Sequence, residues 1–201
     1  MQENQTSLFQ VIINHSGLSL GETQAINNLF SRYNVDENEI EPDYEYASIL
    51  EIEFIKDEKI PFFEFIPIDK WSTLIEIIKN VKKRRGKKGL RFKSIITEIY
   101  DLENTEYDKP KTLKKKTEFL LNHKDNTDFN KGLERIEITI ENIIETDESQ
   151  KSQALQQKTD KEVTKNTNQN KAANDDLNPI SFIFDESKRR WIKPIDKIQR
   201  A

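Results

Sequence analysis

The sequence has no cysteine, a single methionine and only five glycines among its 201 residues. Without cysteine, the chain can form no disulfide, bind no metal through thiolates and use no cysteine nucleophile. The glycines form neither a P-loop nor a dinucleotide-binding pattern, and no serine stands in a nucleophile elbow. No apolar run approaches the roughly 20 residues that a membrane-spanning helix needs. We therefore expect no cofactor, no membrane partner and no catalytic residue of these kinds.

A secretory signal is also missing from the start of the sequence. The first 14 residues lack a basic segment, and the apolar run from Leu8 to Ile13 is too short for a signal-peptide core. Together with the missing cysteine, this favours a soluble cytoplasmic protein. Charged residues make up 34% of the chain, above the roughly 25% of typical globular domains. The net charge of −4 alone points to neither nucleic acid nor membrane, so the local distribution of charge matters more.

The spacing of apolar residues predicts one α+β domain over residues 8–144. Up to residue 100 its elements follow the order strand, helix, strand, strand, helix, strand, which resembles the split βαβ arrangement of ferredoxin-like sandwiches. The resemblance implies a mostly antiparallel sheet with two helices packed on one face. A C-terminal hairpin adds two strands, the second of which alternates isoleucines with polar residues. The predicted strands cover residues 8–14, 47–55, 62–66, 90–100, 112–122 and 133–144, and the helices cover residues 20–33 and 69–85.

The second predicted helix carries an apolar stripe that should face the core. It begins at Asp69, which we assign as its N-cap, after a strand bracketed by Pro61 and Pro67. Gly86 marks its end. The stripe follows the helical repeat and consists of Trp71, Leu74, Ile75, Ile78 and Val81.

Composition separates this domain from the rest of the chain. Residues 1–7 are polar and should be frayed. Residues 145–178 are polar and lack aromatics, so they cannot bury enough surface to offset the entropy of ordering, and we predict a disordered linker. Apolar residues return in a tail motif over residues 179–201. A chain that ends near Glu145 should therefore fold by itself.

Eight cations and no acid fall between Lys82 and Lys93, which is the strongest local charge feature of the sequence. Such a cluster can neutralise phosphates and release their counterions, so we predict a solvent-facing site for a nucleic acid or another polyanion, without buried ion pairs. Two alternatives stay open. The cations can simply favour a helix C-terminus through its dipole, or the acidic loop from Asp36 to Glu45 can fold across them. The basic patch consists of Lys82, Lys83, Arg84, Arg85, Lys87, Lys88, Arg91 and Lys93.

Aromatic residues and histidines suggest two further kinds of site. On this topology, an RNA-recognition module would stack bases on Phe63, Phe65 and Phe92. The aromatic-and-glycine signature of such modules is missing, so we expect these three to be core residues. His15 and His123 are the only histidines and lie at strand ends in polar surroundings. We predict that both are surface residues and that neither binds a metal.

The tail motif supplies an alternative function. It can dock on its own domain, or it can present Phe182, Phe184 and Trp191 to a partner protein, since apolar islands in disordered tails often fold on contact. We therefore expect a non-catalytic binding protein: first a nucleic-acid or polyanion binder, and second a protein-interaction module that uses the tail or a sheet edge. An enzyme ranks third, because no acid–base pair or nucleophile stands out.

Overall fold

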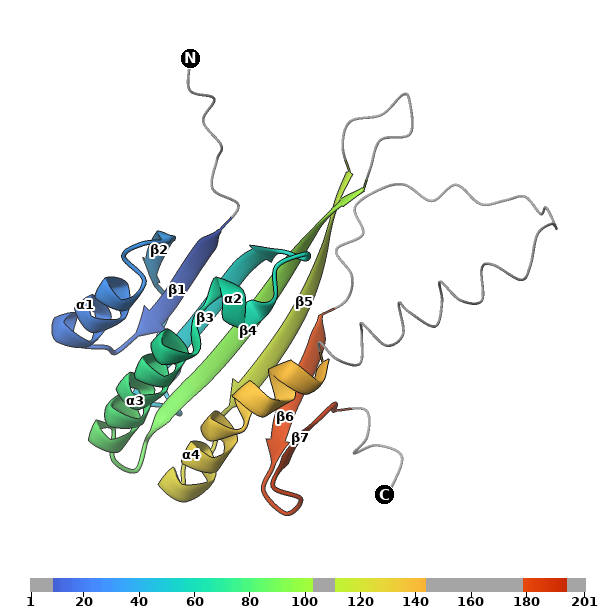
Figure 1. Cartoon of the computed structure of the whole chain (residues 1–201). Helices are drawn as coiled ribbons and strands as arrows, with labels where there is room; N and C mark the ends of the chain where they lie inside the picture. Colours follow the sequence, from blue (N-terminus) through green and yellow to red (C-terminus); the bar gives the residue numbers. More distant parts are fainter. Residues whose placement is uncertain (1–8, 103–110, 144–178, 195–201) are drawn as a thin grey trace.

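A mixed β-sheet of seven strands forms the body of the computed structural model, and helices cover one of its faces (Figure 1). The structure describes residues 9–102, 111–143 and 179–194. The predicted frayed terminus and the predicted linker lie outside these residues. The α+β class is confirmed. The strands are β1 (Gln10–Ser16), β2 (Asn34–Glu39), β3 (Ser48–Asp57), β4 (Leu90–Leu102), β5 (Lys111–Leu121), β6 (Ile180–Asp185) and β7 (Arg190–Ile192), and the helices are α1 (Leu20–Leu29), α2 (Phe62–Phe65), α3 (Ile68–Arg84) and α4 (Asn126–Glu134).

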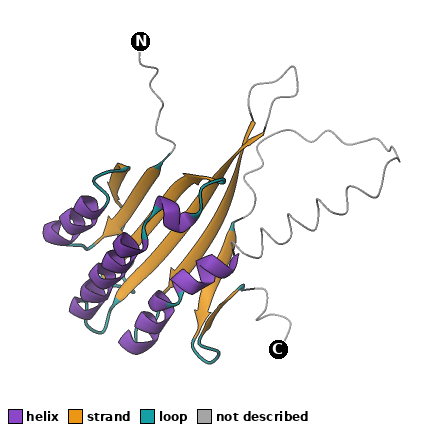
Figure 2. Cartoon of the chain, viewed as in Figure 1, coloured by secondary structure: helices purple, strands orange, loops and turns teal. Residues whose placement is uncertain are grey.

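Parallel and antiparallel pairs alternate across the sheet, whose order is β2-β1-β3-β4-β5-β6-β7. β1 runs parallel to β2, β3 to β4 and β5 to β6, while all the remaining neighbours are antiparallel. A helix follows the first strand of each parallel pair, because parallel strands need a crossover connection. The ferredoxin-like order and the mostly antiparallel sheet are therefore not confirmed. Figure 2 shows α1, α3 and α4 on the same face of the sheet.

The core lies between this face of the sheet and the helices. α3 packs its predicted stripe there, and each of the five stripe residues is at most 7% exposed. The N-cap is Pro67, two residues before the predicted Asp69, which lies in the first turn, so the predicted Asp69 cap is wrong. Gly86 has a φ of +56°, in the left-handed region that glycine adopts without strain, and it does mark the helix end.

Two predicted strands are helical. The segment from Phe62 to Phe65 forms α2, with Ile66 at its C-cap, and the buried Phe65 and Ile66 follow the buried Phe62 by three and four positions. The described part of the second predicted strand, residues 133–143, holds the end of α4, a turn at Arg135 and a second helical segment over residues 136–143. The predicted C-terminal hairpin is therefore wrong, and β5 pairs with β4 and β6 instead.

One strand lies where the sequence suggested only an acidic loop. β2 has a single apolar residue, Val35, and forms an edge of the sheet beside β1. Charged residues on an edge strand discourage pairing with other chains, which explains a strand without the usual apolar alternation. The aromatic residues considered for base stacking lie elsewhere than on an exposed sheet face: Phe65 and Phe92 are buried in the core, and Phe63 packs against it.

The tail motif extends the sheet through β6 and β7. Its residues Phe182, Phe184 and Trp191 are each at most 8% exposed. The ring of Phe182 stacks on Phe119 at 5.4 Å between centroids, and the indole nitrogen of Trp191 donates to the Gly132 carbonyl at 3.1 Å. The structure thus shows the first of the two arrangements left open by the sequence, in which the tail docks on its own sheet.

Candidate functional site

Several loops lie together at one end of the sheet, which we call the loop end. Figure 1 shows the α3–β4, β5–α4 and β6–β7 connections at this end, at the bottom of the view. The β2–β3 loop joins them, because the Tyr46 hydroxyl donates to the Asn122 carbonyl at 3.1 Å and the Ala47 amide donates to the Gly89 carbonyl at 3.1 Å. The predicted basic patch spans the end of α3 and the start of β4, so most of it falls at the loop end.

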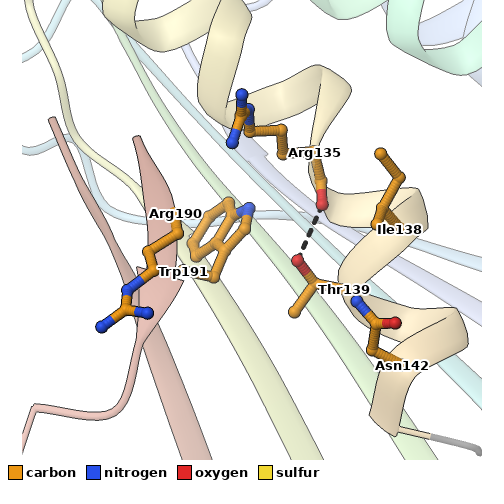
Figure 3. A pocket seen from close by; sticks show the side chains of 6 residues that line it. All are labelled: Arg135, Ile138, Thr139, Asn142, Arg190 and Trp191. Atoms are coloured by element: carbon orange, nitrogen blue, oxygen red, sulfur yellow. Dashed lines mark hydrogen bonds between the residues drawn. The ribbon is translucent and has the colours of Figure 1, made fainter. Parts of the chain in front are cut away.

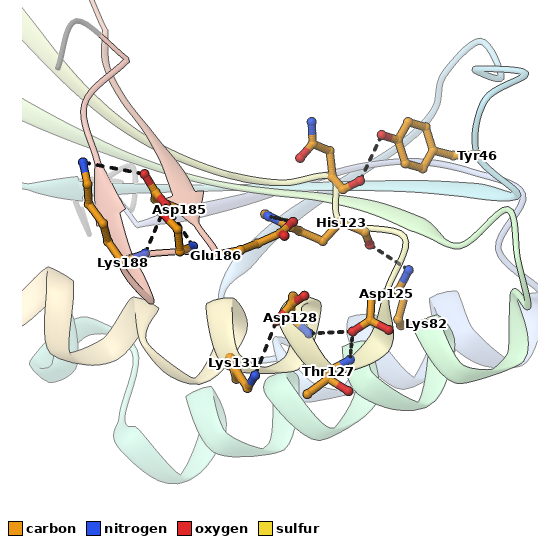
Figure 4. Close-up of polar contacts among 12 residues, drawn as sticks. Tyr46, Lys82, His123, Asp125, Thr127, Asp128, Lys131, Asp185, Glu186 and Lys188 are labelled. Atoms are coloured by element: carbon orange, nitrogen blue, oxygen red, sulfur yellow. Dashed lines mark hydrogen bonds and ion pairs between the residues drawn. The ribbon is translucent and has the colours of Figure 1, made fainter. Parts of the chain in front are cut away.

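Lys82 is part of the core rather than of the surface. The residue is 1% exposed, and its Nζ donates to the carbonyl of His123 at 2.9 Å (Figure 4). It also donates to the carbonyl of Lys124 at 2.9 Å. The same ammonium lies 5.0 Å from the ring centre of Phe129, a cation–π contact. Burial lowers its pKa. Lys82 therefore links α3 to the β5–α4 loop through hydrogen bonds, and its ammonium group is not available to a ligand.

Arg85 forms a buried ion pair with Glu22, which joins the start of α1 to the end of α3. Glu22 is 4% exposed, and Arg85 also donates to Ser48 Oγ at the start of β3. Burial alone would raise the pKa of Glu22, but hydrogen bonds from the backbone amide of Ser19 and from Arg85 outweigh it and lower the pKa. Arg84 lies farther away, with 3.4 Å from its Nη1 to Glu22 Oε1.

Arg91 and Lys93 lie on the face of the sheet without helices and are neutralised there. Arg91 Nη1 lies 2.7 Å from Asp43 Oδ2, and its Nη2 lies 3.5 Å from Glu51 Oε1. Lys93 Nζ lies 3.0 Å from Glu118 Oε1. The predicted patch without buried ion pairs is therefore wrong for Arg85, and the alternative in which the acidic loop reaches the patch holds for Arg91.

The other four cations of the patch are exposed. Lys83 and Arg84 lie in the last turn of α3, and Lys87 and Lys88 lie in the turn that follows. Within the described residues, the side chains of Lys83, Lys87 and Lys88 meet no acid, carbonyl or ring. The structure thus divides one continuous basic run into cations with internal partners and cations that face solvent.

Two cations that sequence reasoning missed lie at the same end. Lys124, in the β5–α4 loop, is exposed, and its Nζ lies 5.5 Å from the ring centre of Tyr46. Arg189 is exposed in the β6–β7 turn. Lys124 stands between a histidine and an aspartate, so nothing local marks it, whereas Arg189 belongs to a run of three cations that did carry a signal. The basic end is the set Lys83, Arg84, Lys87, Lys88, Lys124 and Arg189.

Most acidic side chains at the loop end have hydrogen-bond or ion-pair partners within the protein (Figure 4). Asp125 accepts from two backbone amides at the start of α4, at 2.8 and 3.0 Å, and these bonds lower its pKa. Asp185 accepts from Ser187 Oγ at 2.6 Å, which lowers its pKa in turn. Glu186 Oε1 lies 3.0 Å from Nε2 of His123. Two acids of the β2–β3 loop are exposed and have no partner in the described part of the chain, Glu41 and Glu45.

Both histidines are less exposed than predicted. His15 is 8% exposed and lies 2.9 Å from Glu37, and the side chain of His123 is 10% exposed. The three residues predicted to contact a partner, Phe182, Phe184 and Trp191, are packed against α4 and β5. None of these five side chains belongs to the basic end.

The described residues show neither a metal centre nor a membrane span. No three histidine or acidic side chains among them gather closely enough to hold a metal ion, and none of their helices combines the length and apolarity that crossing a bilayer requires. Comparison with models of known protein families, with curated proteins and with solved structures returns no match to this chain.

Proposed function

We propose that the protein binds a nucleic-acid strand through the basic end. The observation that carries the proposal is the set of exposed cations, chiefly Lys83, Lys87 and Lys88, that have no partner in the described part of the chain. Like charges this close repel one another, and phosphates would neutralise them while releasing condensed counterions. Most neighbouring acids are held in caps and ion pairs, so their side chains are not free to pair directly with these three lysines.

The arrangement favours contacts to a phosphate backbone over recognition of base edges. The cations come from three separate loops and the end of α3, whereas reading a duplex groove needs one projecting helix or ribbon. Tyr44 is 88% exposed in the β2–β3 loop at the same end and offers a ring on which an unpaired base can stack. A single strand is therefore the expected ligand, bound with little sequence preference.

The test is fluorescence anisotropy with labelled 20-nucleotide single strands of DNA and RNA across a salt series. Contacts to three to six phosphates predict a slope of log K against log salt of about −2 to −4. The combined variant Lys83→Glu, Lys87→Glu and Lys88→Glu should lose at least tenfold in affinity at low salt. Duplex DNA of the same length should bind more weakly than the single strand.

A matched control changes the same amount of charge at the opposite end of the sheet. Arg32, Lys59 and Lys114 are exposed and without partners among the described residues, and they lie in or beside elements at that end. Reversing all three to glutamate should change affinity less than twofold. Equal losses in both triple variants, or wild-type binding that ignores salt, would contradict the proposal.

A further inference from the structure

A hollow of about 300 Å³ lies at the outer edge of the sheet, between β7 and the helical residues 136–143 (Figure 3). Its floor includes the indole of Trp191, which is held in place by its bond to the Gly132 carbonyl. Ile138 adds an apolar side chain that is 58% exposed. Its lining is Arg135, Ile138, Thr139, Asn142, Arg190 and Trp191.

The strand beside the hollow is the last of the sheet, and no described strand pairs with its outer side. The two edges of the sheet differ in character. β2 carries three acids among its six residues, which repel an incoming strand of acidic character, whereas β7 reads Arg-Trp-Ile. An extended segment that meets β7 would therefore find free backbone groups and cations, and a strand edge is a feature that only a polypeptide can extend.

Two arginines give the edge around the hollow a positive charge, and most of their guanidinium donors make no hydrogen bond within the described residues. Arg135 Nη1 donates to the Arg189 carbonyl, which leaves most of its guanidinium donors free. The side chain of Arg190 is exposed and has no partner among the described residues. The two guanidinium groups lie on opposite sides of β7, Arg135 beside the hollow and Arg190 away from it (Figure 3). Each suits a carboxylate, because it can donate a pair of parallel hydrogen bonds to both oxygens.

We propose that this edge binds an extended acidic segment of a partner protein, which adds to β7 as a further strand and places carboxylates on Arg135 and Arg190. An apolar side chain of the segment packs against Trp191 and Ile138. β7 has only three residues and is followed by Lys193 and Pro194, so backbone pairing is short and the hollow must supply part of the affinity. Trp191 is only 7% exposed, which leaves room for contact with a small apolar side chain but too little open ring for a nucleic-acid base to stack on.

The probe is a fluorescein-labelled ten-residue peptide in which pairs of glutamates alternate with pairs of valines, so that each face of the added strand carries both residue types. We expect binding in the micromolar range, with new protection from amide exchange at β7. The same peptide with lysine in place of glutamate should bind at least tenfold more weakly. A version N-methylated at alternate residues should also lose at least tenfold, because it cannot donate to a strand edge.

Variants separate this site from the basic end. Arg190→Glu and Arg135→Glu should each weaken peptide binding at least tenfold while thermal unfolding stays unchanged for Arg190→Glu. The Lys83, Lys87 and Lys88 triple reversal should change peptide affinity less than twofold, so failure of one proposal leaves the other standing. The inference is overturned if the N-methylated peptide binds as well as the parent, if the triple reversal abolishes peptide binding, or if Arg190→Glu impairs oligonucleotide binding and leaves peptide binding unchanged.

Discussion

Glu22 carries a charge in a nearly closed environment, where its carboxylate faces Arg85 and, at longer range, Arg84. Removing one member of a buried ion pair leaves the other charge without compensation, which typically costs 3–5 kcal/mol. Glu22→Gln should therefore lower the free energy of unfolding by about 3 kcal/mol. Chemical denaturation at pH 7 measures it. Glu41→Gln is the control, because Glu41 is exposed and should change stability by less than about 0.5 kcal/mol.

The same pair predicts how stability responds to acid. The folded pKa of Glu22 lies below its ordinary value, so its contribution is complete above the unfolded pKa of about 4.3 and is lost as the pH falls through the folded pKa. The difference in unfolding free energy between wild type and Glu22→Gln should be constant from pH 5 to pH 8 and shrink below about pH 4.3. Urea denaturation of both proteins at each pH measures it. A difference that stays constant down to pH 2.5 would contradict the lowered pKa.

Gly132 shows how closely α4 lies against the tail strands. A Cβ at this position would lie 2.5 Å from Leu121 Cδ2 and 3.1 Å from Phe184 Cγ. Gly132→Ala should destabilise the protein by about 1–3 kcal/mol through overpacking, despite the better helix propensity of alanine. Gly21, in α1, has nothing within 4 Å of such a Cβ. Gly21→Ala should therefore stabilise by up to about 1 kcal/mol, and thermal unfolding of both variants gives the sign of each effect.

At the scale of a single element, α3 is the helix whose burial was clearest from sequence. Ile78 is fully buried in the middle of its stripe, so Ile78→Ala should cost about 2–5 kcal/mol through the lost contacts and the cavity. Asn80 is exposed on the same helix, and Asn80→Ala should be neutral or slightly stabilising. Urea denaturation of both variants tests the difference. A neutral Ile78→Ala would show that the stripe does not face the sheet.

The stripe of α3 also explains which cations of the basic patch are buried. Positions 71, 74, 75, 78 and 81 continue at helical spacing to Lys82 and then to Arg85. Lys82 is therefore buried and Arg85 half-buried, while Lys83 and Arg84 are exposed, although the Arg84 guanidinium reaches Glu22 at 3.4 Å. The helical spacing that places Lys82 and Arg85 on the stripe could be read from the sequence, but their charge led us to predict that they face solvent. What the sequence could not supply is the partner of each buried cation, because Glu22 and the His123 carbonyl lie on other elements.

The segment after α4 illustrates an ambiguity of isoleucine-rich sequence. Ile136, Ile138 and Ile140 alternate with polar residues as in a strand, but Leu133, Ile136 and Ile140 also lie three and four apart. The structure buries the second set and leaves Ile138 exposed. Short segments satisfy both periods, and the packing of β6 and β7 against α4 is consistent with the helical one. That packing joins residues distant in sequence and has no local signature.

For the molecule as a whole, the pairing of the tail strands β6 and β7 was the hardest feature to predict from the sequence, and truncation of the chain tests its importance directly. β6 pairs with β5 across a long stretch of intervening sequence, as in the register of Phe119 with Phe182. A chain cut after Glu145 would lose both tail strands and expose the side of α4 that faces them. Composition led us to expect that such a chain folds by itself, whereas the contacts of β6 and β7 with β5 and α4 favour the opposite outcome.

We predict that residues 1–145 alone form a loosened domain, with α4 poorly packed and the end of β5 around Phe119 left as an unpaired edge. Phe119 and Phe129 are fully buried in the full chain, and truncation removes Phe182 and Trp191 from around Phe119. Amide exchange should be fast in α4 and β5 of the truncated protein but slow in β1 and β3, which keep their neighbours. A synthetic peptide of residues 179–194, added in trans, should restore protection in α4 and β5, whereas the same peptide with Phe184→Ser and Trp191→Ser should not. Slow exchange throughout the truncated protein without peptide would show that the tail strands are dispensable for packing α4.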